Sequence, residues 1–301
     1  MKIVGAGLNG LIGREVKGRL LQQHTLVLLR HQGPATHLPQ TIMRQLVWDP
    51  PHLGEWAGEL EGADAVINLA GEPIADNRWT EAQKTVLETS RIQTTKALVD
   101  AISRCKAKPK VFLNASAIGY YGPRDSAALD EKAEPGTGFL AEMCQRWETE
   151  AARAESLGVR TVRLRTGIVL ARNAGALAKM VPPFNLFIGG PLGSGTQVMS
   201  WIHLEDEVNA ILKALEDPAI RGPVNLTAPG AVTMNEFAKT MGRVLKKPAF
   251  FRVPPIALKL LLGEMSSMLL TGQNVYPKKL LAAGFKFKYS SLQPALESLL
   301  F

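Results

Sequence analysis

The chain has 301 residues, of which 46% are hydrophobic, and its net charge is +8. This length and apolar content predict a large core in one big domain or two coupled domains. Lysine and arginine are scattered, without a dense basic stretch or interleaved aromatic residues, so we expect no nucleic-acid partner. The longest apolar run near the end, Ile256 to Leu270, contains Lys259 and Glu264, and we therefore expect no membrane span.

The chain contains two cysteines, Cys105 and Cys144. They form no zinc-binding pattern and no disulfide framework, so we expect no metal and a reducing compartment. We expect no secretory signal, because a short strand followed by a loop of regularly spaced glycines begins next to residue 1. The expected location is the cytoplasm, or an organelle stroma or matrix if a transit peptide has been removed.

A short apolar strand at Lys2 to Ala6 runs into three glycines with regular spacing, Gly7, Gly10 and Gly13. The first glycine permits a tight turn, the second lets the backbone approach a pyrophosphate, and the third lets the next helix pack closely. The helix start then offers N–H groups to phosphate oxygens. An ordinary glycine-rich turn is the alternative interpretation. The residues expected to contact the cofactor here are Gly7, Leu8, Asn9, Gly10, Leu11, Ile12 and Gly13.

The second strand, Thr25 to Leu29, ends at Arg30 and His31. An acidic residue at this point favours NAD, because it binds the ribose 2′-hydroxyl, whereas an arginine suits the 2′-phosphate of NADP. The sequence has no Asp or Glu between Gln22 and Pro34, so we predict NADP as the cofactor, with Arg30 and His31 in contact with it. A solvated arginine at a strand end is the alternative.

Strands and helices alternate over the next part of the chain, which predicts an α/β fold of the Rossmann type with a doubly wound parallel sheet. We predict an NADP-binding domain over 1–170, whose sheet also receives 196–230. A smaller, mostly helical substrate lobe is predicted over 171–195 and 231–301. Dense glycine and proline between Gly175 and Gly195 predict a loop there. The further strands are expected near 45–48, 65–70, 111–116, 161–164 and 223–226, and the main helices over 81–105, 138–157, 204–215, 235–245, 256–270, 278–283 and 292–300.

With these residues in place, the chain resembles the extended short-chain dehydrogenase/reductase superfamily, and within it the atypical "epimerase family" group. The resemblance rests on the glycine loop, on Ser116 to Gly122 and on Trp201 to Asp206. It is strengthened by further short stretches at 68–72, 78–80, 90–91, 147–148, 165–167 and 284–285. It implies a nucleotide site in which Leu69, Ala70 and Gly71 end the fourth strand beside the cofactor, and in which Ser116 contacts both cofactor and substrate oxygen.

The chain departs from this superfamily at the catalytic residues. The superfamily reduces a carbonyl group with a tyrosine and a lysine four residues apart on the helix after the serine strand. Here the nearest register has Leu140 and Cys144 at those two positions. The catalytic candidates are therefore Ser116, Tyr120, Tyr121, Cys144 and Arg91, of which Tyr120, Tyr121 and Cys144 are the candidate proton donors.

Three functional interpretations remain open. In the first, the protein is an oxidoreductase or epimerase-like enzyme that acts on a small carbonyl or hydroxyl compound, and a substitute group moves the proton. In the second, the nucleotide is a structural or sensing ligand of a regulator. In the third, the chain is a scaffold that has lost the nucleotide. A homo-oligomer or a protein partner fits any of the three.

Overall fold

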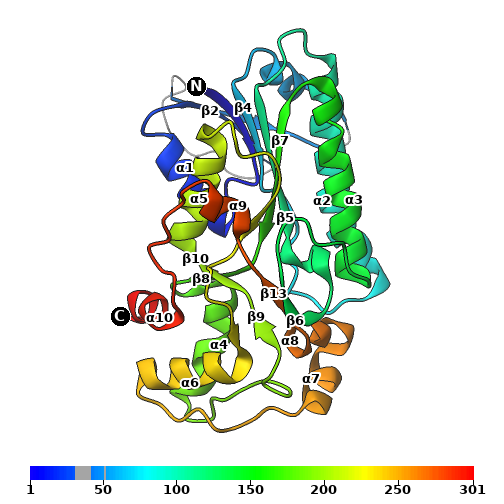
Figure 1. Cartoon of the computed structure of the whole chain (residues 1–301). Coiled ribbons are helices and arrows are strands. Elements are labelled where there is room, and N and C mark those ends of the chain that lie inside the picture. The colour runs from blue at the N-terminus through cyan, green and yellow to red at the C-terminus, as the bar shows by residue number, and fades with distance from the viewer. Residues whose placement is uncertain (31–41, 51) are drawn as a thin grey trace.

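The computed structural model describes residues 1–30, 42–50 and 52–301. Its centre is a seven-stranded sheet in the order β11-β7-β5-β4-β1-β2-β3, in which every neighbouring pair is parallel (Figure 1). These strands are β1 (Lys2–Ala6), β2 (Thr25–Arg30), β3 (Met43–Val47), β4 (Ala65–Asn68), β5 (Val111–Ala117), β7 (Arg160–Thr166) and β11 (Gly222–Leu226).

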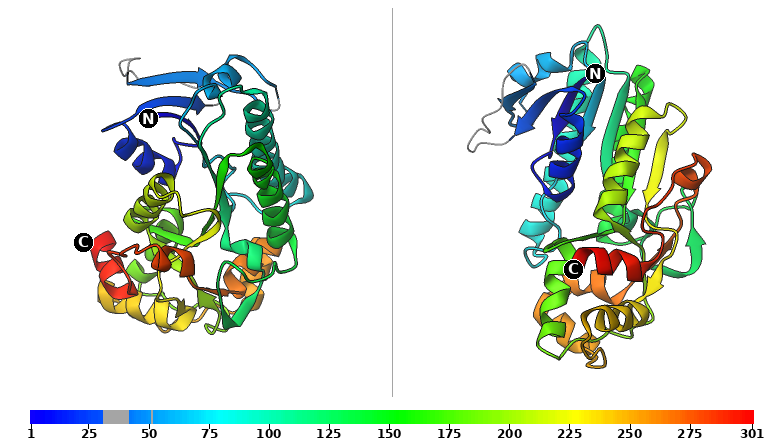
Figure 2. Two further views of the ribbon diagram at one scale, coloured as in Figure 1. Left: turned by 45° about the horizontal axis from the view of Figure 1, so that its top comes forward. Right: turned by 90° about the vertical axis from the view of Figure 1, so that its left-hand side faces the viewer.

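Helices cover both faces of the sheet, because the strands carry buried apolar residues on both sides. On one face α1 (Leu11–Leu20) and α5 (Leu204–Glu216) pack against strand residues such as Ile3 and Leu113. On the other face α2 (Glu81–Arg104) and α3 (Phe139–Ala152) pack against residues such as Val4 and Phe112, together with the 3₁₀ turns η1 (Glu55–Leu60) and η3 (Glu155–Leu157). Figure 2 shows the same arrangement of two helical layers around the sheet. The predicted fold class is confirmed.

The direction in which successive strands are added to the sheet reverses between β1 and β4. These two neighbouring strands are parallel, so the chain leaves both of them on the same side of the sheet, at their carboxyl ends. Ala6 pairs with Asn68 at their carboxyl ends, so the glycine loop and the segment after Asn68 emerge side by side. In open parallel sheets, ligands bind in the crevice outside such a reversal point.

The end of the molecule opposite the N-terminus is mostly helical (Figures 1 and 2). Its core contains residues of the helices α4 (Gly175–Asn185), α6 (Met234–Leu245) and α10 (Leu292–Leu300). Two short strand pairs also contribute to this core. In one, β8 (Ile168–Ala171) pairs with β10 (Trp201–His203); in the other, β9 (Val198–Met199) pairs with β12 (Val232–Thr233). The remaining elements are η2 (Ile118–Tyr121), β6 (Arg124–Leu129), α7 (Pro255–Leu262), η4 (Gly263–Ser266), α8 (Ser267–Leu270), β13 (Gln273–Val275) and α9 (Lys278–Ala282).

Two details of the predicted secondary structure are wrong. The segment after Gly175 begins as helix α4 rather than as loop, and Pro182 and Pro183 lie inside that helix. Burial of Leu177 and Phe184 in the helical core outweighs the two missing N–H groups. The helix expected over 256–270 is divided into three pieces, because Gly263 takes the positive φ of +61° that ends α7.

Strand β11 brings residues from 196–230 into the main sheet, but the exact domain boundaries stay a prediction. Among the helices that the structure describes, none is both long enough and apolar enough to cross a bilayer.

Candidate functional site

The glycine loop is built so that the ends of β1, β4 and α1 come into close contact. Gly7 has a φ of +75°, and a Cβ atom added to it would lie 2.3 Å from the backbone nitrogen of Ala70. A Cβ atom on Gly13 would lie 2.3 Å from the carbonyl oxygen of Gly7. These two positions therefore require glycine for packing alone.

Gly10 has a different environment. It is exposed, and a Cβ atom there would meet only the Gly7 oxygen, at 3.4 Å. Gly10 is also the N-cap of α1, which has no side-chain cap and no acidic residue in its first turn. The amide groups at this helix start thus face an open surface, which suits an anionic diphosphate.

The side chains around Gly10 leave that surface free. Leu8 is completely buried in the core, where its side chain fills the space beside Gly5 of β1. The exposed Asn9 accepts a hydrogen bond from Lys17 Nζ at 2.8 Å. Leu8 can therefore meet a bound diphosphate through its backbone, not its side chain.

The ends of the neighbouring strands complete this edge of the sheet. Leu29 of β2 pairs with Ala6, so the half-buried Arg30 lies one residue beyond, level with Gly7. His31 lies outside the described residues. On the other side of β1, Leu69 donates its N–H to the Ala6 oxygen, and Asn68 Oδ1 accepts the N–H of Ala70 at 3.1 Å.

A buried polar cluster fixes the end of β4. Asn68 Nδ2 donates to Asn114 Oδ1 at 2.7 Å and to Thr95 Oγ1 at 3.0 Å. Thr95 also accepts from Trp147 Nε1, so this cluster joins β4, β5, α2 and α3. A cluster in which every member is paired makes the position of Ala70 and Gly71 rigid.

Arg91 on α2 lies directly against Gly71, where an added Cβ atom would be 3.2 Å from its guanidinium carbon. Its two terminal nitrogens donate to the carbonyl oxygens of Leu87 and Glu72 at 3.0 and 2.9 Å. Burial lowers the pKa of this guanidinium from its usual value, and the group remains a cation. Arg91 thus supplies a fixed, half-buried positive charge at the end of β4.

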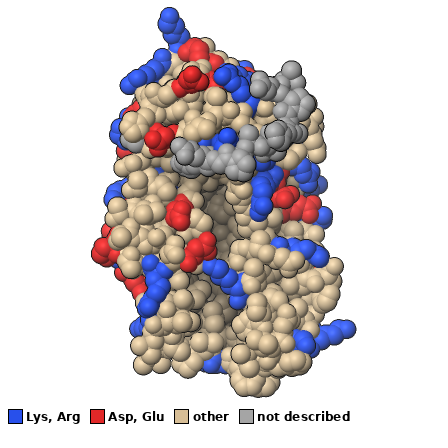
Figure 3. All heavy atoms as spheres, turned by 180° about the vertical axis from the view of Figure 1, so that it is seen from behind, with Lys and Arg blue, Asp and Glu red and all other residues tan. Residues whose placement is uncertain are grey.

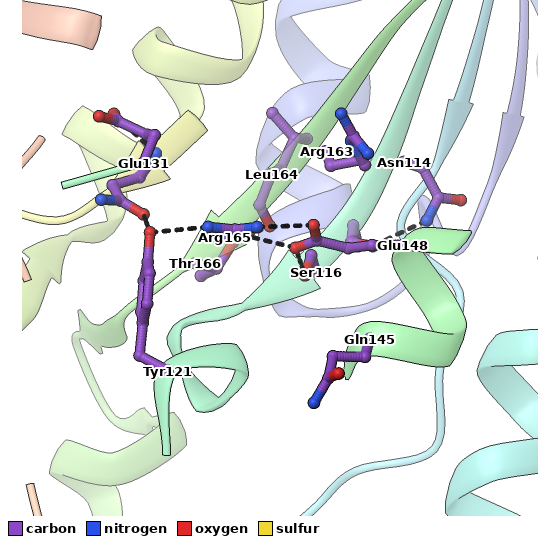
Figure 4. A network of polar contacts seen from close by, with 12 residues as sticks. Asn114, Ser116, Tyr121, Glu131, Gln145, Glu148, Arg163, Leu164, Arg165 and Thr166 are labelled. Carbon is purple, nitrogen blue, oxygen red and sulfur yellow. Dashed lines mark hydrogen bonds and ion pairs between the residues drawn. The ribbon is translucent and has the colours of Figure 1, made fainter. Parts of the chain in front are cut away.

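Ser116 faces α3 and is part of a closed network (Figure 4). Its hydroxyl group donates to Glu148 Oε1 at 2.7 Å. The same carboxylate accepts two hydrogen bonds from Arg165 of β7, at 2.7 and 2.8 Å, and both charged side chains are nearly inaccessible. The fork-shaped contact satisfies both carboxylate oxygens.

The network continues from Arg165 to Tyr121 (Figure 4). Arg165 Nη1 donates to the Tyr121 oxygen at 2.9 Å, and that hydroxyl group lies 2.7 Å from Asn225 Oδ1, to which it donates. Burial raises the pKa of Tyr121 to about 12, although the Arg165 cation opposes this. Tyr121 therefore stays protonated at neutral pH.

Tyr120 is half-buried and its ring packs against Arg165. The Arg165 guanidinium lies 3.5 Å from the centre of its ring, and the rings of Tyr120 and Tyr121 meet edge to face. Within the described ranges, no hydrogen bond engages the Tyr120 hydroxyl group.

Leu140 and Cys144 occupy one face of α3 and pack against η2. A Cβ atom on Gly119 would lie 3.3 Å from the Leu140 Cβ and 3.7 Å from the Cys144 sulfur. Cys144 is 1% exposed, and burial raises the pKa of its thiol to about 12. The thiol is therefore neutral and shielded from solvent at pH 7.

The structure thus brings Ser116, Tyr120 and Tyr121 together around Arg165. Cys144 packs against Gly119 of η2, the turn that carries the two tyrosines. Sequence reasoning did not identify Glu148, Arg165 and Asn225 as parts of the site, although the resemblance includes the first two. Arg165 near the carboxyl end of a strand and a glutamate beside Trp147 were the available signals. Their pairing depends on how α3 packs on β7, which no local pattern reveals.

The described part of the chain has no candidate metal site, and a cavity that it contains lies apart from the predicted site residues. No group of three His, Cys, Asp or Glu side chains is arranged to hold a metal among the described residues. A cavity of about 590 Å³ lies between α2 and the segment after β3, and no predicted site residue lines it. The surface is hollowed by a furrow near the middle of the face shown in Figure 3.

Comparisons with known proteins cover the whole chain. The sequence profile of the NAD dependent epimerase/dehydratase family matches residues 3–226, and that of a domain of unknown function (DUF1731) matches residues 253–299. The epimerase family protein SDR39U1 homolog, chloroplastic, of Arabidopsis thaliana is 39% identical over 310 residues, covering 100% of this chain and 87% of the relative. The epimerase family protein YfhF of Bacillus subtilis is 38% identical over 306 residues, covering 100% and 98%.

Solved structures agree with these matches. The human epimerase family protein SDR39U1 (isoform 2), crystallised with NADPH, superposes with a TM-score of 0.88 at 32% identity and with 99% of both chains covered. UDP-glucuronic acid 4-epimerase of Bacillus cereus, in complex with NAD, has a TM-score of 0.78 at 18% identity over 99% of this chain and 96% of that one. The second likeness is one of fold alone.

Proposed function

Because the chain belongs to the NAD dependent epimerase/dehydratase family, we propose that it binds NADP(H) across the carboxyl ends of β1, β2 and β4. The observation that carries the proposal is the uncapped, open helix start at Gly10, between two glycines that packing alone requires. Gly7, Gly10 and Gly13 would hold the diphosphate, and Arg30 would bind the 2′-phosphate. Support also comes from the human SDR39U1 structure, which contains NADPH.

Titration of the purified protein with NADPH and with NADH, followed by tryptophan fluorescence, tests this proposal. We expect tighter binding of NADPH, because a guanidinium group at position 30 can form a forked contact with the extra phosphate. Arg30→Ala should weaken NADPH binding by about tenfold or more and leave NADH binding unchanged. Arg19→Ala, an exposed change at the end of α1, is the matched control. Equal affinities for the two nucleotides would refute the role of Arg30.

We further propose that the chain is an oxidoreductase on a small carbonyl or hydroxyl compound, with Tyr120 as its proton donor. Tyr120 is favoured over Tyr121 and Cys144 because its hydroxyl group is not engaged by the described residues, whereas the other two groups are buried with raised pKa values. The Arg165 cation against its ring would stabilise the phenolate left after proton transfer. Bound NADPH would supply the hydride. Arg91 would add positive charge near the reacting oxygen.

A screen of NADPH oxidation with a panel of aldehydes and ketones tests the chemistry. If turnover occurs, Tyr120→Phe should lower kcat by about a hundredfold or more while NADPH affinity stays the same. Tyr121→Phe and Cys144→Ser should retain most of the activity. An active Tyr120→Phe variant would exclude this tyrosine as the donor.

One feature favours a second candidate function, that of a nucleotide-binding regulator. The hydroxyl group of Ser116 is bound to the buried Glu148, so it is already engaged at the place where a substrate oxygen would need it. Firm NADPH binding without turnover over a broad panel, together with a protein partner recovered only when NADPH is present, would support this function.

We propose a cytoplasmic location; the relative from Arabidopsis is named chloroplastic.

A further inference from the structure

The end of the molecule opposite the N-terminus is strongly basic. Residues 172–203 and 231–271 together contain eight Lys or Arg residues and two Asp or Glu residues. About a quarter of the chain therefore carries six of its eight net positive charges. Figures 1 and 2 show α4, α6 and α7 together at this end. In the lowest part of the face shown in Figure 3, the charged side chains in view are Lys and Arg; Asp and Glu side chains are seen higher up.

The two acidic residues of these segments do not balance that charge. Glu236 caps α6, where its carboxylate accepts the N–H of Thr233 at 2.7 Å. Glu264 forms an ion pair with Lys84 of α2 at 2.5 Å, and Lys84 lies outside the two segments. Lys179 is likewise paired outside the segments, with Asp76 at 2.9 Å. The remaining positive charge at this end is open to an external partner.

Exposed apolar side chains are concentrated at the same end. Eight of the fourteen exposed large apolar side chains of the described residues lie here, and between 46% and 76% of each is accessible. We call them the apolar end patch: Leu186, Phe187, Ile188, Phe250, Phe251, Ile256, Leu260 and Leu261. Such a concentration in one region is typical of an interaction surface.

Local structure holds these side chains outward. Phe187 has a positive φ of +62°, unusual for a residue with a side chain, in the turn that follows α4. Lys247 Nζ lies 3.9 Å from the centre of the Phe187 ring, and the rings of Phe250 and Phe251 are in contact at 4.5 Å. The backbone N–H of Phe251 donates a hydrogen bond to the carbonyl oxygen of Gly189. This bond holds the segment with Phe250 and Phe251 beside the segment 186–188.

Helix α7 adds a nearly continuous apolar segment to the patch. Of its eight residues only Leu258 is buried, and Lys259 is its one charged residue. A helix that exposes most of its leucine and isoleucine side chains to water has a surface still to be covered.

We propose that the apolar end patch docks the protein on an anionic phospholipid surface without crossing it. The apolar side chains would enter the boundary between head groups and acyl chains, and the surrounding Lys and Arg side chains would pair with lipid phosphates. A second copy of the chain is a poorer occupant, because it would bring two basic ends together. The proposal is independent of the nucleotide site.

Flotation of the full chain with lipid vesicles tests the proposal. We expect binding to vesicles that contain phosphatidylglycerol, weak binding to pure phosphatidylcholine, and loss of binding as salt is raised. Changing Leu260 and Leu261 together to Ser should lower the partition coefficient on anionic vesicles by roughly tenfold or more. Lys247→Gln with Lys259→Gln should lower it several-fold.

Matched controls come from outside the two segments. Val86→Ser removes an exposed apolar side chain on α2, and Lys106→Gln removes an exposed charge; both should bind vesicles as the unchanged protein does. Circular dichroism and thermal unfolding check that all variants fold. The proposal is overturned if anionic vesicles are not bound, or if the patch variants bind like the controls. It is also overturned if sedimentation shows a dimer that the patch variants dissociate.

Discussion

Glu207, on α5, is completely buried. Thr166 Oγ1 donates to its Oε1 at 2.8 Å, while its Oε2 has no partner among the described residues. Burial raises the pKa of this carboxyl group to about 8, against about 4.5 in an unfolded chain. The folded state therefore holds a proton that the unfolded state releases above pH 4.5, and the stability of the protein must fall as the pH rises towards 8.

Glu207→Gln replaces the carboxyl group with a neutral group of similar shape. We expect this variant to lose much less stability between pH 5 and pH 8 than the unchanged protein, whose loss from this group is at most about 5 kcal/mol. Urea unfolding at several pH values measures the difference. Glu216→Gln, an exposed change on the same helix, should leave the pH dependence intact. Parallel pH profiles for Glu207→Gln and the unchanged protein would contradict the assignment.

At the scale of the element, helix α1 contains two glycines, Gly13 and Gly18, whose surroundings differ sharply. Gly13 faces the Gly7 oxygen, while a Cβ atom on Gly18 would have nothing within 4 Å. Gly13→Ala should destabilise the protein by about 2–4 kcal/mol, because backbone atoms must move apart. Gly18→Ala should stabilise it by roughly 0.5–1 kcal/mol, because alanine loses less entropy in a helix. Equal effects in urea unfolding would show that Gly13 is not tightly packed.

These two glycines also show what local sequence can predict. The loop at Gly7 to Gly13 and the sheet strands have short-range patterns, and the fold class predicted from them is confirmed. The family resemblance, which rests on short motifs spread over the chain, is confirmed as well. Helix α4 was missed because Pro182 and Pro183 argue locally against a helix. Burial of its apolar side in the core that it shares with β8 and α6 stabilises it.

The buried network at Arg165 could not be predicted for a related reason. Glu148 and Arg165 are seventeen residues apart and lie on different elements, and Asn225 lies sixty residues beyond Arg165. Their contacts depend on the register of β7 between β5 and β11 and on the rotation of α3. Sequence spacing contains no information on either quantity, so the assignment of Ser116 and the two tyrosines stays a prediction.

At the scale of the whole molecule, the chain passes several times between the region of the seven-stranded sheet and the mostly helical end. The chain leaves the main sheet after β7, contributes β8 and α4, returns through α5 to β11, and leaves again for α6. Helix α5 packs on α1 in the main sheet region, while Asp206 of α5 accepts backbone N–H groups of Lys288 and Tyr289 just before α10. Neither region can unfold without breaking contacts in the other.

We therefore expect a single cooperative unfolding transition in scanning calorimetry, in spite of the two regions. NADPH at about 100 times its Kd should stabilise the folded protein by about 2.7 kcal/mol and raise the whole transition by several degrees. Arg30→Ala should have a nearly unchanged Tm without nucleotide but a much smaller shift with it. Two separate transitions, of which NADPH moves only one, would show that the regions unfold independently and that the crossings do not couple them.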